Sequence, residues 1–180
     1  MKTPILLLSL LVTGESLLAQ VDTGRPTSGT PYDRYMGPVR QVYARSGSNS
    51  PSIDQVRSQL RTARRFRYYF NAAEPYTPQA PEVTESRKQG DCKAKSLWLA
   101  SKMLDRNTRY VVGKAKLGSK MSHAWLLWQN GGEWLFLDPT MEGDVVYADK
   151  VTGRKLIMQY SYRGSTAYVH PSYNEYVTTK

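Results

Sequence analysis

The feature that most constrains this chain is its only cysteine, Cys92, which lies within the run QGDCK at 89–93. The apolar residues after it recur at helical intervals, and neither Gly nor Pro intervenes before Asp105, so a helix is predicted to begin at Cys92. His123 and Asp138 follow in that order, in runs enriched in strand-forming residues. A thiol in the first turn of a helix, an imidazole and a carboxylate are the groups of a nucleophile, its base and an orienting acid.

A predicted β-hairpin brings the imidazole and the carboxylate together. Residues 123–129 and 133–138 are rich in Trp, Leu and Phe, and the turn signal Asn-Gly-Gly at 130–132 separates them. In an antiparallel hairpin, the start of one strand and the end of its partner share an edge. We therefore expect His123 and Asp138 to meet on one face of that edge, where the carboxylate would orient the ring.

Other segments predict a mixture of helix and strand. A helix is expected from about residue 53 to 70, because apolar residues recur at helical spacing there and Ser52 with Gln55 resembles a capping box. Further strands are expected at 109–115, 145–148, 156–162 and 167–169.

The N-terminus has the pattern of a secretory signal peptide over residues 1–19. Lys2 supplies the positive end, residues 5–12 are almost wholly apolar, and residues 16–19 form a plausible cleavage region. The apolar stretch is too short for a typical membrane span and Glu15 interrupts its extension. We therefore expect a secreted or periplasmic protein with no transmembrane anchor after signal cleavage.

The mature chain is predicted to consist of an arm and one domain. Residues 20–50 are rich in Gly, Pro, Ser and Thr and show no sustained hydrophobic period, which favours an extended or flexible arm. Residues 51–180 are long enough for one compact domain with its own core, but not comfortably for two.

The chain is strongly basic, with a formal net charge of +10. This charge favours polyanionic surroundings such as an anionic cell-envelope polymer, although a generally basic soluble enzyme accounts for it equally well. One face of the helix predicted at 53–70 carries a stripe of arginines, which would be either a solvated face or an anion-binding surface; no specific nucleic-acid binding is predicted. The stripe consists of Arg57, Arg61, Arg64, Arg65 and Arg67.

A single cysteine leaves three roles open. In an exported chain Cys92 cannot form an internal disulfide, so it is a buried inert thiol, an intermolecular bridge or a reactive group, and the neighbouring Gly-Asp favours the last. His170, which precedes a proline, is interpreted as a structural or surface residue. One cysteine and two histidines do not make the usual metal sets, so no cofactor or metal is predicted.

Three runs resemble the core of the transglutaminase-like superfamily, in particular its bacterial cysteine peptidases. They are GDCKAKSL at 90–97, HAW at 123–125 and WLFLDPT at 134–140, and the resemblance covers residues 89–140. It implies an α+β, papain-like fold in which the cysteine lies at the N-terminus of a central helix packed on an antiparallel sheet.

The resemblance also implies roles for individual residues. Cys92 would be the nucleophile, His123 the general base and acid, and Asp138 the residue that orients His123. Backbone donors at the start of the helix, with the side chain of Gln89, would stabilise the oxyanion of the tetrahedral intermediate.

These expectations favour an exported cysteine-dependent hydrolase that cleaves peptide or other amide bonds through a thioester. The same residues would support amine transfer of the transglutaminase type, since a fold does not determine which acceptor takes the acyl group. A non-catalytic module that binds an anionic cell-envelope polymer through the arginine stripe is a third alternative. A peptide or protein substrate is the expected partner of the two enzymes.

Overall fold

The structure is a computed structural model that describes residues 21–47, 50–116, 118–151 and 156–171. Its elements in chain order are β1 (Arg25–Thr27), η1 (Asp33–Tyr35), α1 (Gly37–Ala44), α2 (Ile53–Arg65), β2 (Arg67–Tyr68), α3 (Pro81–Arg87), β3 (Gln89–Gly90), α4 (Cys92–Met103), β4 (Thr108–Lys114), β5 (Ser122–Asn130), β6 (Glu133–Leu137), β7 (Val146–Tyr147), η2 (Ala148–Lys150), β8 (Ile157–Arg163) and β9 (Thr166–Val169). The larger sheet is antiparallel with strand order β1-β9-β8-β4-β5-β6-β7, while β2 and β3 form a separate parallel pair. The predicted α+β fold, with a helix that begins at the cysteine and packs on an antiparallel sheet, is confirmed.

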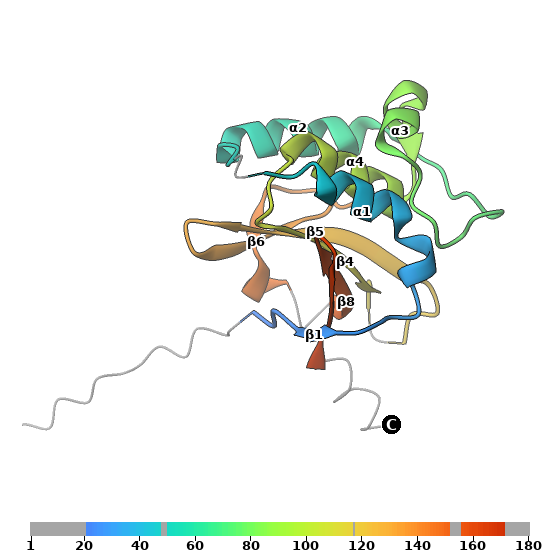
Figure 1. Cartoon of the computed structure of the whole chain (residues 1–180). Coiled ribbons are helices and arrows are strands. Elements are labelled where there is room, and N and C mark those ends of the chain that lie inside the picture. Colours follow the sequence, from blue (N-terminus) through green and yellow to red (C-terminus); the bar gives the residue numbers. More distant parts are fainter. Residues whose placement is uncertain (1–20, 48–49, 117, 152–155, 172–180) are drawn as a thin grey trace, which may run out of the picture.

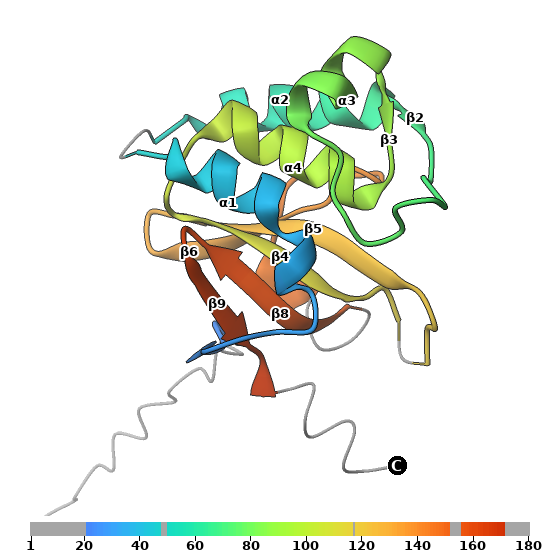
Figure 2. The same cartoon turned by 45° about the vertical axis from the view of Figure 1, so that its right-hand side comes forward.

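The helix α4 occupies the centre of the helical layer. The helices α1 to α4 lie on one face of the larger sheet (Figures 1 and 2), and α4 contacts the other three as well as β5. Its hydrophobic residues are therefore buried all around, among them Trp98, whose ring packs edge-on against Phe66 at 4.9 Å between centroids. Ser96 also donates to the carbonyl of Ala124, at 3.2 Å, which fixes α4 on β5.

The other face of the sheet has a smaller core of its own. Trp125, Leu127 and Phe136 point away from the helices, because they alternate with residues that pack on the helical side. The short helix η2 closes this second core with Ala148, which is fully buried. Both faces of the central strands are thus covered, as their nearly continuous apolar sequences require.

The helix α2 begins where the sequence predicts and ends earlier. The hydroxyl of Ser52 accepts from the Gln55 backbone N–H at 3.2 Å, and the Gln55 side-chain oxygen accepts from the Ser52 N–H at 2.8 Å, so the capping box is present. The predicted extension to residue 70 is wrong, because Phe66 adopts an extended backbone (ψ 138°) that turns its ring into the core. The chain then enters β2 at Arg67.

The expectation of an extended or flexible arm over 20–50 is wrong for residues 37–44, which form the helix α1. Strand β1 pairs with β9 at the edge of the sheet, and α1 buries Val39, Val42 and Tyr43 against the core that contains α4. Pro38 lies in the first helical turn, where its missing N–H breaks no hydrogen bond. The domain therefore includes this segment, whereas the predicted signal peptide, residues 1–19, lies outside the described residues.

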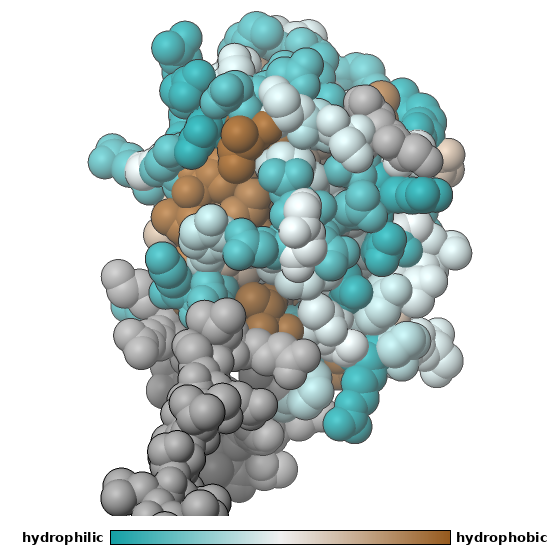
Figure 3. Space-filling model, turned by 90° about the vertical axis from the view of Figure 1, so that its left-hand side faces the viewer, coloured by the Kyte–Doolittle hydropathy of each residue, from teal (hydrophilic) through white to brown (hydrophobic). Residues whose placement is uncertain are grey.

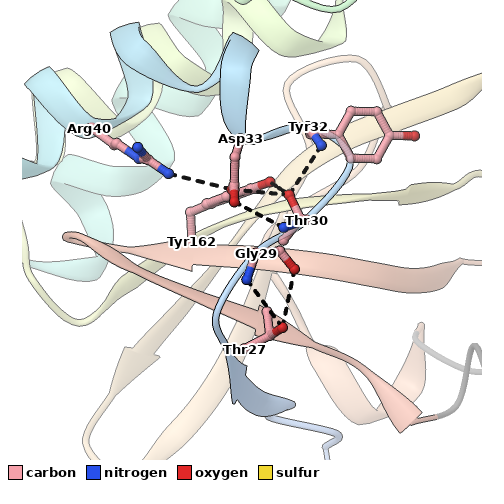
Figure 4. Close-up of polar contacts among 7 residues, drawn as sticks. All are labelled: Thr27, Gly29, Thr30, Tyr32, Asp33, Arg40 and Tyr162. Carbon is pink, nitrogen blue, oxygen red and sulfur yellow. Dashed lines mark hydrogen bonds and ion pairs between the residues drawn. The ribbon is translucent and has the colours of Figure 1, made fainter.

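Polar contacts fix the segment between β1 and α1 over the sheet (Figure 4). The Thr30 hydroxyl lies 2.5 Å from that of Tyr162 on β8, and also donates to the Asp33 carboxylate at 3.1 Å. Arg40 forms an ion pair with Asp33 at 3.4 Å, which joins the segment to α1. The backbone N–H of Tyr32 donates to the Thr30 oxygen at 3.1 Å, so these contacts also set the position of Tyr32.

Hydrophobic residues are not evenly distributed over the surface. The side that lies at the left in Figure 1 is mainly hydrophilic, with one larger hydrophobic patch and a smaller one below it (Figure 3). Among the described residues, large exposed hydrophobic side chains occur at 68–76, at Met121 and at 141–147. Gathered apolar surface is more typical of binding sites than scattered residues are. In the parts of the chain that the structure describes, no helix has both the length and the apolarity to cross a bilayer.

The predicted structural role of His170 is consistent with its burial. Its ring is fully buried, with Nε2 at 2.9 Å from the Ser161 hydroxyl and Nδ1 at 3.5 Å from the Asp22 carboxylate. Gly24 lies against the same ring in a left-handed conformation (φ +72°), and a methyl group there would come within 3.0 Å of the ring. The contacts join the segment before β1 to the segment after β9.

We predict that Gly24→Ala lowers the free energy of unfolding by about 1 to 2 kcal/mol, since the substitution adds backbone strain and a clash with His170. Urea denaturation measures the change. Gly29→Ala is the matched control, because a methyl group there meets only the Asp33 carboxylate, at 3.5 Å, and Gly29 has no left-handed backbone. Equal stability of the two variants would contradict the prediction.

Candidate active site

The thiol of Cys92 lies at a capped helix N-terminus. The Asp91 carboxylate accepts from the Ala94 backbone N–H at 3.0 Å, and its other oxygen forms an ion pair with Lys93. The helix α4 therefore begins at Cys92, where the helix dipole favours an anionic sulfur. Only 5% of Cys92 is exposed, but the residue borders an open cavity rather than lying wholly within the core.

The predicted contact between His123 and Asp138 is confirmed. Leu126 of β5 pairs with Leu137 of β6, which places the next residue, Asp138, opposite Trp125. The side chains of Trp125 and His123 lie on the same face of β5, because they are two residues apart in a strand. The His123 Nε2 lies 2.6 Å from the Asp138 carboxylate, which is almost fully buried. His123 and Cys92 border the same cavity, and Cys92 is among the groups that raise the pKa of His123. The structure thus brings the three predicted side chains together.

The electrostatics of the pair favour an imidazolium beside a carboxylate. Burial alone would lower the pKa of His123, but hydrogen bonds and charge interactions with Asp138 and Cys92 outweigh it and raise that pKa to about 10. Burial alone would raise the pKa of Asp138. The contacts with His123 and Thr140 outweigh burial and hold that pKa below its ordinary value. A protonated imidazole next to a sulfur is an arrangement that favours the thiolate.

Two further residues hold Asp138, one at its carboxylate and one at its backbone carbonyl. Thr140 donates to one carboxylate oxygen from its backbone N–H at 2.8 Å and from its hydroxyl at 2.7 Å. Arg64 on α2 donates to the Asp138 carbonyl at 3.3 Å and to the carbonyl of Gly143. The loop after β6 is therefore fastened to α2, which limits the positions open to the carboxylate.

The Asp138 loop also engages part of the arginine stripe, whose role as a solvated or an anion-binding face stays a prediction. Arg64 is largely occupied by the loop, and burial lowers its pKa. Arg57 pairs with Asp144 of the same loop at 3.1 Å and with Asp54 at 3.4 Å. Two of the five arginines thus hold the Asp138 loop rather than presenting free cationic charge.

The side chain of Gln89 is engaged away from the thiol. Its oxygen accepts from the guanidinium of Arg67 at 2.5 Å, and Gln89 is not among the residues that line the cavity at Cys92. Its predicted role as an oxyanion donor therefore has no support in the geometry.

Tyr68 is the residue at the site that the sequence did not reveal. It lines the same cavity as Cys92, and the two side chains interact electrostatically. Burial and the nearby Cys92 and Asp91 raise the pKa of Tyr68 to about 12, so the phenol keeps its proton at neutral pH. The pairing of β2 with β3, which places Tyr68 opposite Gly90, sets this position, and a pair of two-residue strands leaves no periodic signal in the sequence.

A cavity of about 360 Å³ opens beside Cys92 and His123. We refer to it as the Cys92 cavity. Its remaining lining consists of Tyr32, Met36, Tyr68, Phe70, Pro75, Tyr76, Lys93, Tyr110, Val112, Lys114, Lys120, Met121, Ser122 and Ala124. Within the described ranges, no group of three or more His, Cys, Asp and Glu residues is arranged to hold a metal ion.

Comparison with known proteins identifies the fold. No family model and no curated protein matches the sequence. Calcium-bound LapG of Legionella pneumophila superposes with a TM-score of 0.55 and 13% sequence identity, covering 79% of this chain and 96% of LapG. The EGTA-treated form of LapG gives a TM-score of 0.54 and 15% identity, covering 76% of this chain and 74% of LapG. At such identities the likeness shows the fold, which is the papain-like or transglutaminase-like α+β fold.

We predict that Asp138→Asn lowers the pKa of His123 from about 10 to near or below the ordinary value of about 6.5, because burial of the charged ring is then poorly opposed. The ring would consequently lose its proton between these two pH values, where the native ring keeps it. NMR titration of the ring protons measures the shift. His170, which contacts Ser161 and Asp22 and not Asp138, is the internal control. An unchanged His123 titration would contradict the assignment of its charge to Asp138.

Proposed function

We propose that the protein is an exported cysteine-dependent hydrolase that cleaves peptide or other amide bonds. The observation that carries the proposal is that Cys92 and His123 border one open cavity while His123 contacts the Asp138 carboxylate. LapG, which shares the fold, is a transglutaminase-like cysteine protease and so supports a hydrolase of this kind. Export is inferred from the signal-like sequence of residues 1–19 alone.

In the first half of the proposed reaction, the Cys92 sulfur attacks the carbonyl carbon of the amide. The electrons of the carbonyl double bond move to its oxygen, which gives a tetrahedral oxyanion. When this intermediate collapses, the C–N bond breaks and the leaving nitrogen takes a proton from the imidazolium of His123. The acyl group remains on the sulfur as a thioester, while Asp138 holds the neutral ring in position.

In the second half, water replaces the departed amine. The neutral ring of His123 removes a proton from the water as its oxygen attacks the thioester carbonyl. Collapse of the second oxyanion breaks the C–S bond, releases a carboxylic acid and restores the thiolate and the imidazolium. An amine in place of the water would give amide transfer with the same residues.

The oxyanion would be held at the start of α4. The backbone N–H of Cys92 lies at a helix N-terminus, and the Tyr68 side chain lines the cavity beside it. An entering carbonyl oxygen can accept from this N–H, and the phenol can donate to the same oxygen. We therefore assign Tyr68 the donor role that the sequence had suggested for Gln89.

We predict that Cys92 of the purified protein reacts with iodoacetamide at pH 6 at least about tenfold faster than free cysteine, because the imidazolium of His123 stabilises its thiolate. His123→Ala should remove this advantage. Labelling that is no faster than free cysteine, or that is unaffected by His123→Ala, would rule out an activated thiol.

The acyl acceptor is tested with the same preparation. Peptide mixtures should be hydrolysed by the native protein and left intact by Cys92→Ala. A labelled primary amine distinguishes the alternative, since its incorporation without net hydrolysis would identify amine transfer instead.

We also predict that Tyr68→Phe lowers kcat about 100-fold and changes KM little, because the lost hydroxyl contacts the reacting carbonyl oxygen rather than the rest of the substrate. Steady-state hydrolysis measures both parameters. Tyr69→Phe is the matched control, as it removes the same group from a neighbour that does not line the Cys92 cavity. A normal kcat in Tyr68→Phe would eliminate the proposed donor.

A further inference from the structure

We infer that the Cys92 cavity binds a large apolar or aromatic side chain of a peptide whose neighbouring residues are acidic. The inference rests on the proposed function, because it names the substrate class of the same site. Three properties of the cavity support it: an aromatic wall that is held in place, an exposed apolar rim, and cationic side chains without acidic ones.

The aromatic wall is preformed by contacts between distant segments. Tyr76 packs against Tyr35 at 5.2 Å and against Tyr32 at 6.2 Å between ring centroids. The Tyr32 hydroxyl lies 2.9 Å from that of Ser122 on β5, and its backbone is fixed by Thr30 (Figure 4). A ligand therefore meets a wall that needs little ordering, which reduces the entropic cost of binding.

The rim of the cavity exposes apolar surface to solvent. Four of the eight large hydrophobic residues that are exposed in the described chain line this one cavity. They are Tyr68 (54% exposed), Phe70 (39%), Tyr76 (46%) and Met121 (63%). Such a cluster is typical of a binding site. The cavity volume of about 360 Å³ also falls within the range of about 300 to 1,000 Å³ for ligand pockets.

Apart from the paired Cys92 and His123, the charged side chains at the cavity all have one sign. Lys93, Lys114 and Lys120 line it, and no Asp or Glu does. Lys93 is neutralised by its ion pair with Asp91, and its ammonium lies 5.2 Å from the centre of the Phe70 ring. The amine of Lys114 donates to the Lys120 carbonyl at 3.0 Å, and within the described ranges neither of these two lysines has a carboxylate at ion-pair distance.

Lys114 and Lys120 therefore supply uncompensated positive charge next to an apolar cavity. Charges at the border of a binding site act mainly on specificity and association rate, and they penalise a partner of like charge. In a bound peptide, acidic residues next to the one whose side chain enters the cavity would lie near the ammonium groups of Lys114 and Lys120. The apolar lining argues against a bare polyanion as the ligand, because a polyanion has no apolar group that could occupy the cavity.

Binding is tested separately from cleavage by using Cys92→Ala protein. The probes are short fluorescent peptides with one central Phe flanked on both sides by Glu, by Gln or by Lys, together with a Glu-flanked peptide whose Phe is replaced by Gly. We expect the Glu-flanked Phe peptide to bind about tenfold tighter than the Gln peptide, and the Lys peptide to bind most weakly. Replacing Phe by Gly should cost about tenfold in affinity.

Charge reversal identifies the lysines. Lys114→Glu with Lys120→Glu, in the same Cys92→Ala background, should abolish or invert the preference for Glu over Lys. Lys116→Glu is the matched control on the same hairpin, because Lys116 is exposed and does not line the cavity; the preference should stay within about twofold there. The circular dichroism spectrum and the melting temperature of the double variant should match those of the Cys92→Ala parent, which verifies that the fold persists.

The inference is overturned by equal affinity for the Glu and Gln peptides, by equal losses in Lys116→Glu and the double variant, or by displacement of the peptide by inorganic polyphosphate as effectively as by unlabelled peptide. Cleavage by native protein without a charge preference would refute this inference alone. Preferential binding of Glu-flanked peptides that native protein never cleaves would refute the hydrolase and leave the binding site supported.

Discussion

The constraint on which this structure depends is a helix that is buried along its length and open at its first residue. Nine of the twelve residues of α4 are buried, because α1, α2 and α3 surround it and β5 lies beneath it. Its N-terminus must then be satisfied locally, and Asp91 does so by accepting from the Ala94 N–H. The cap places Cys92 in the first turn of α4, at the border between the core and the cavity, so packing and reactivity depend on the same contact.

The hairpin and the cysteine helix could be predicted because their signals are local. Gly131 and Gly132 both have positive φ, of 60° and 90°, as a two-residue turn between antiparallel strands requires, and the resulting register decides where Asp138 lies. The helix α1 could not be predicted, since its few apolar residues lie in a Gly-rich and Pro-rich context and gain their stability from packing on α4. Tyr68 was missed for a related reason: its position depends on a two-residue pairing with a distant segment.

The roles of the cationic residues also depend on contacts between segments that are distant in the sequence. The sequence shows an arginine stripe but not the loop that covers part of it, so Arg57 and Arg64 could not be told apart from solvated residues before their carbonyl and carboxylate partners were known. No motif in the sequence distinguishes Lys114 and Lys120 from the other lysines. Only the structure shows that they line a cavity together with aromatic residues. Net charge therefore does not predict where a ligand would meet positive charge, because it counts cations with and without an acidic partner alike.

The edges of the larger sheet have a consequence for self-association. One edge strand of the larger sheet is β1, which has three residues and contains Pro26. The other is β7, which has two residues. Proline has no N–H to offer, and strands this short present few free backbone groups to another molecule. A peptide drawn to this protein would find little opportunity to extend the sheet from either side, which leaves side-chain recognition as the means of discrimination and disfavours filament growth by strand addition.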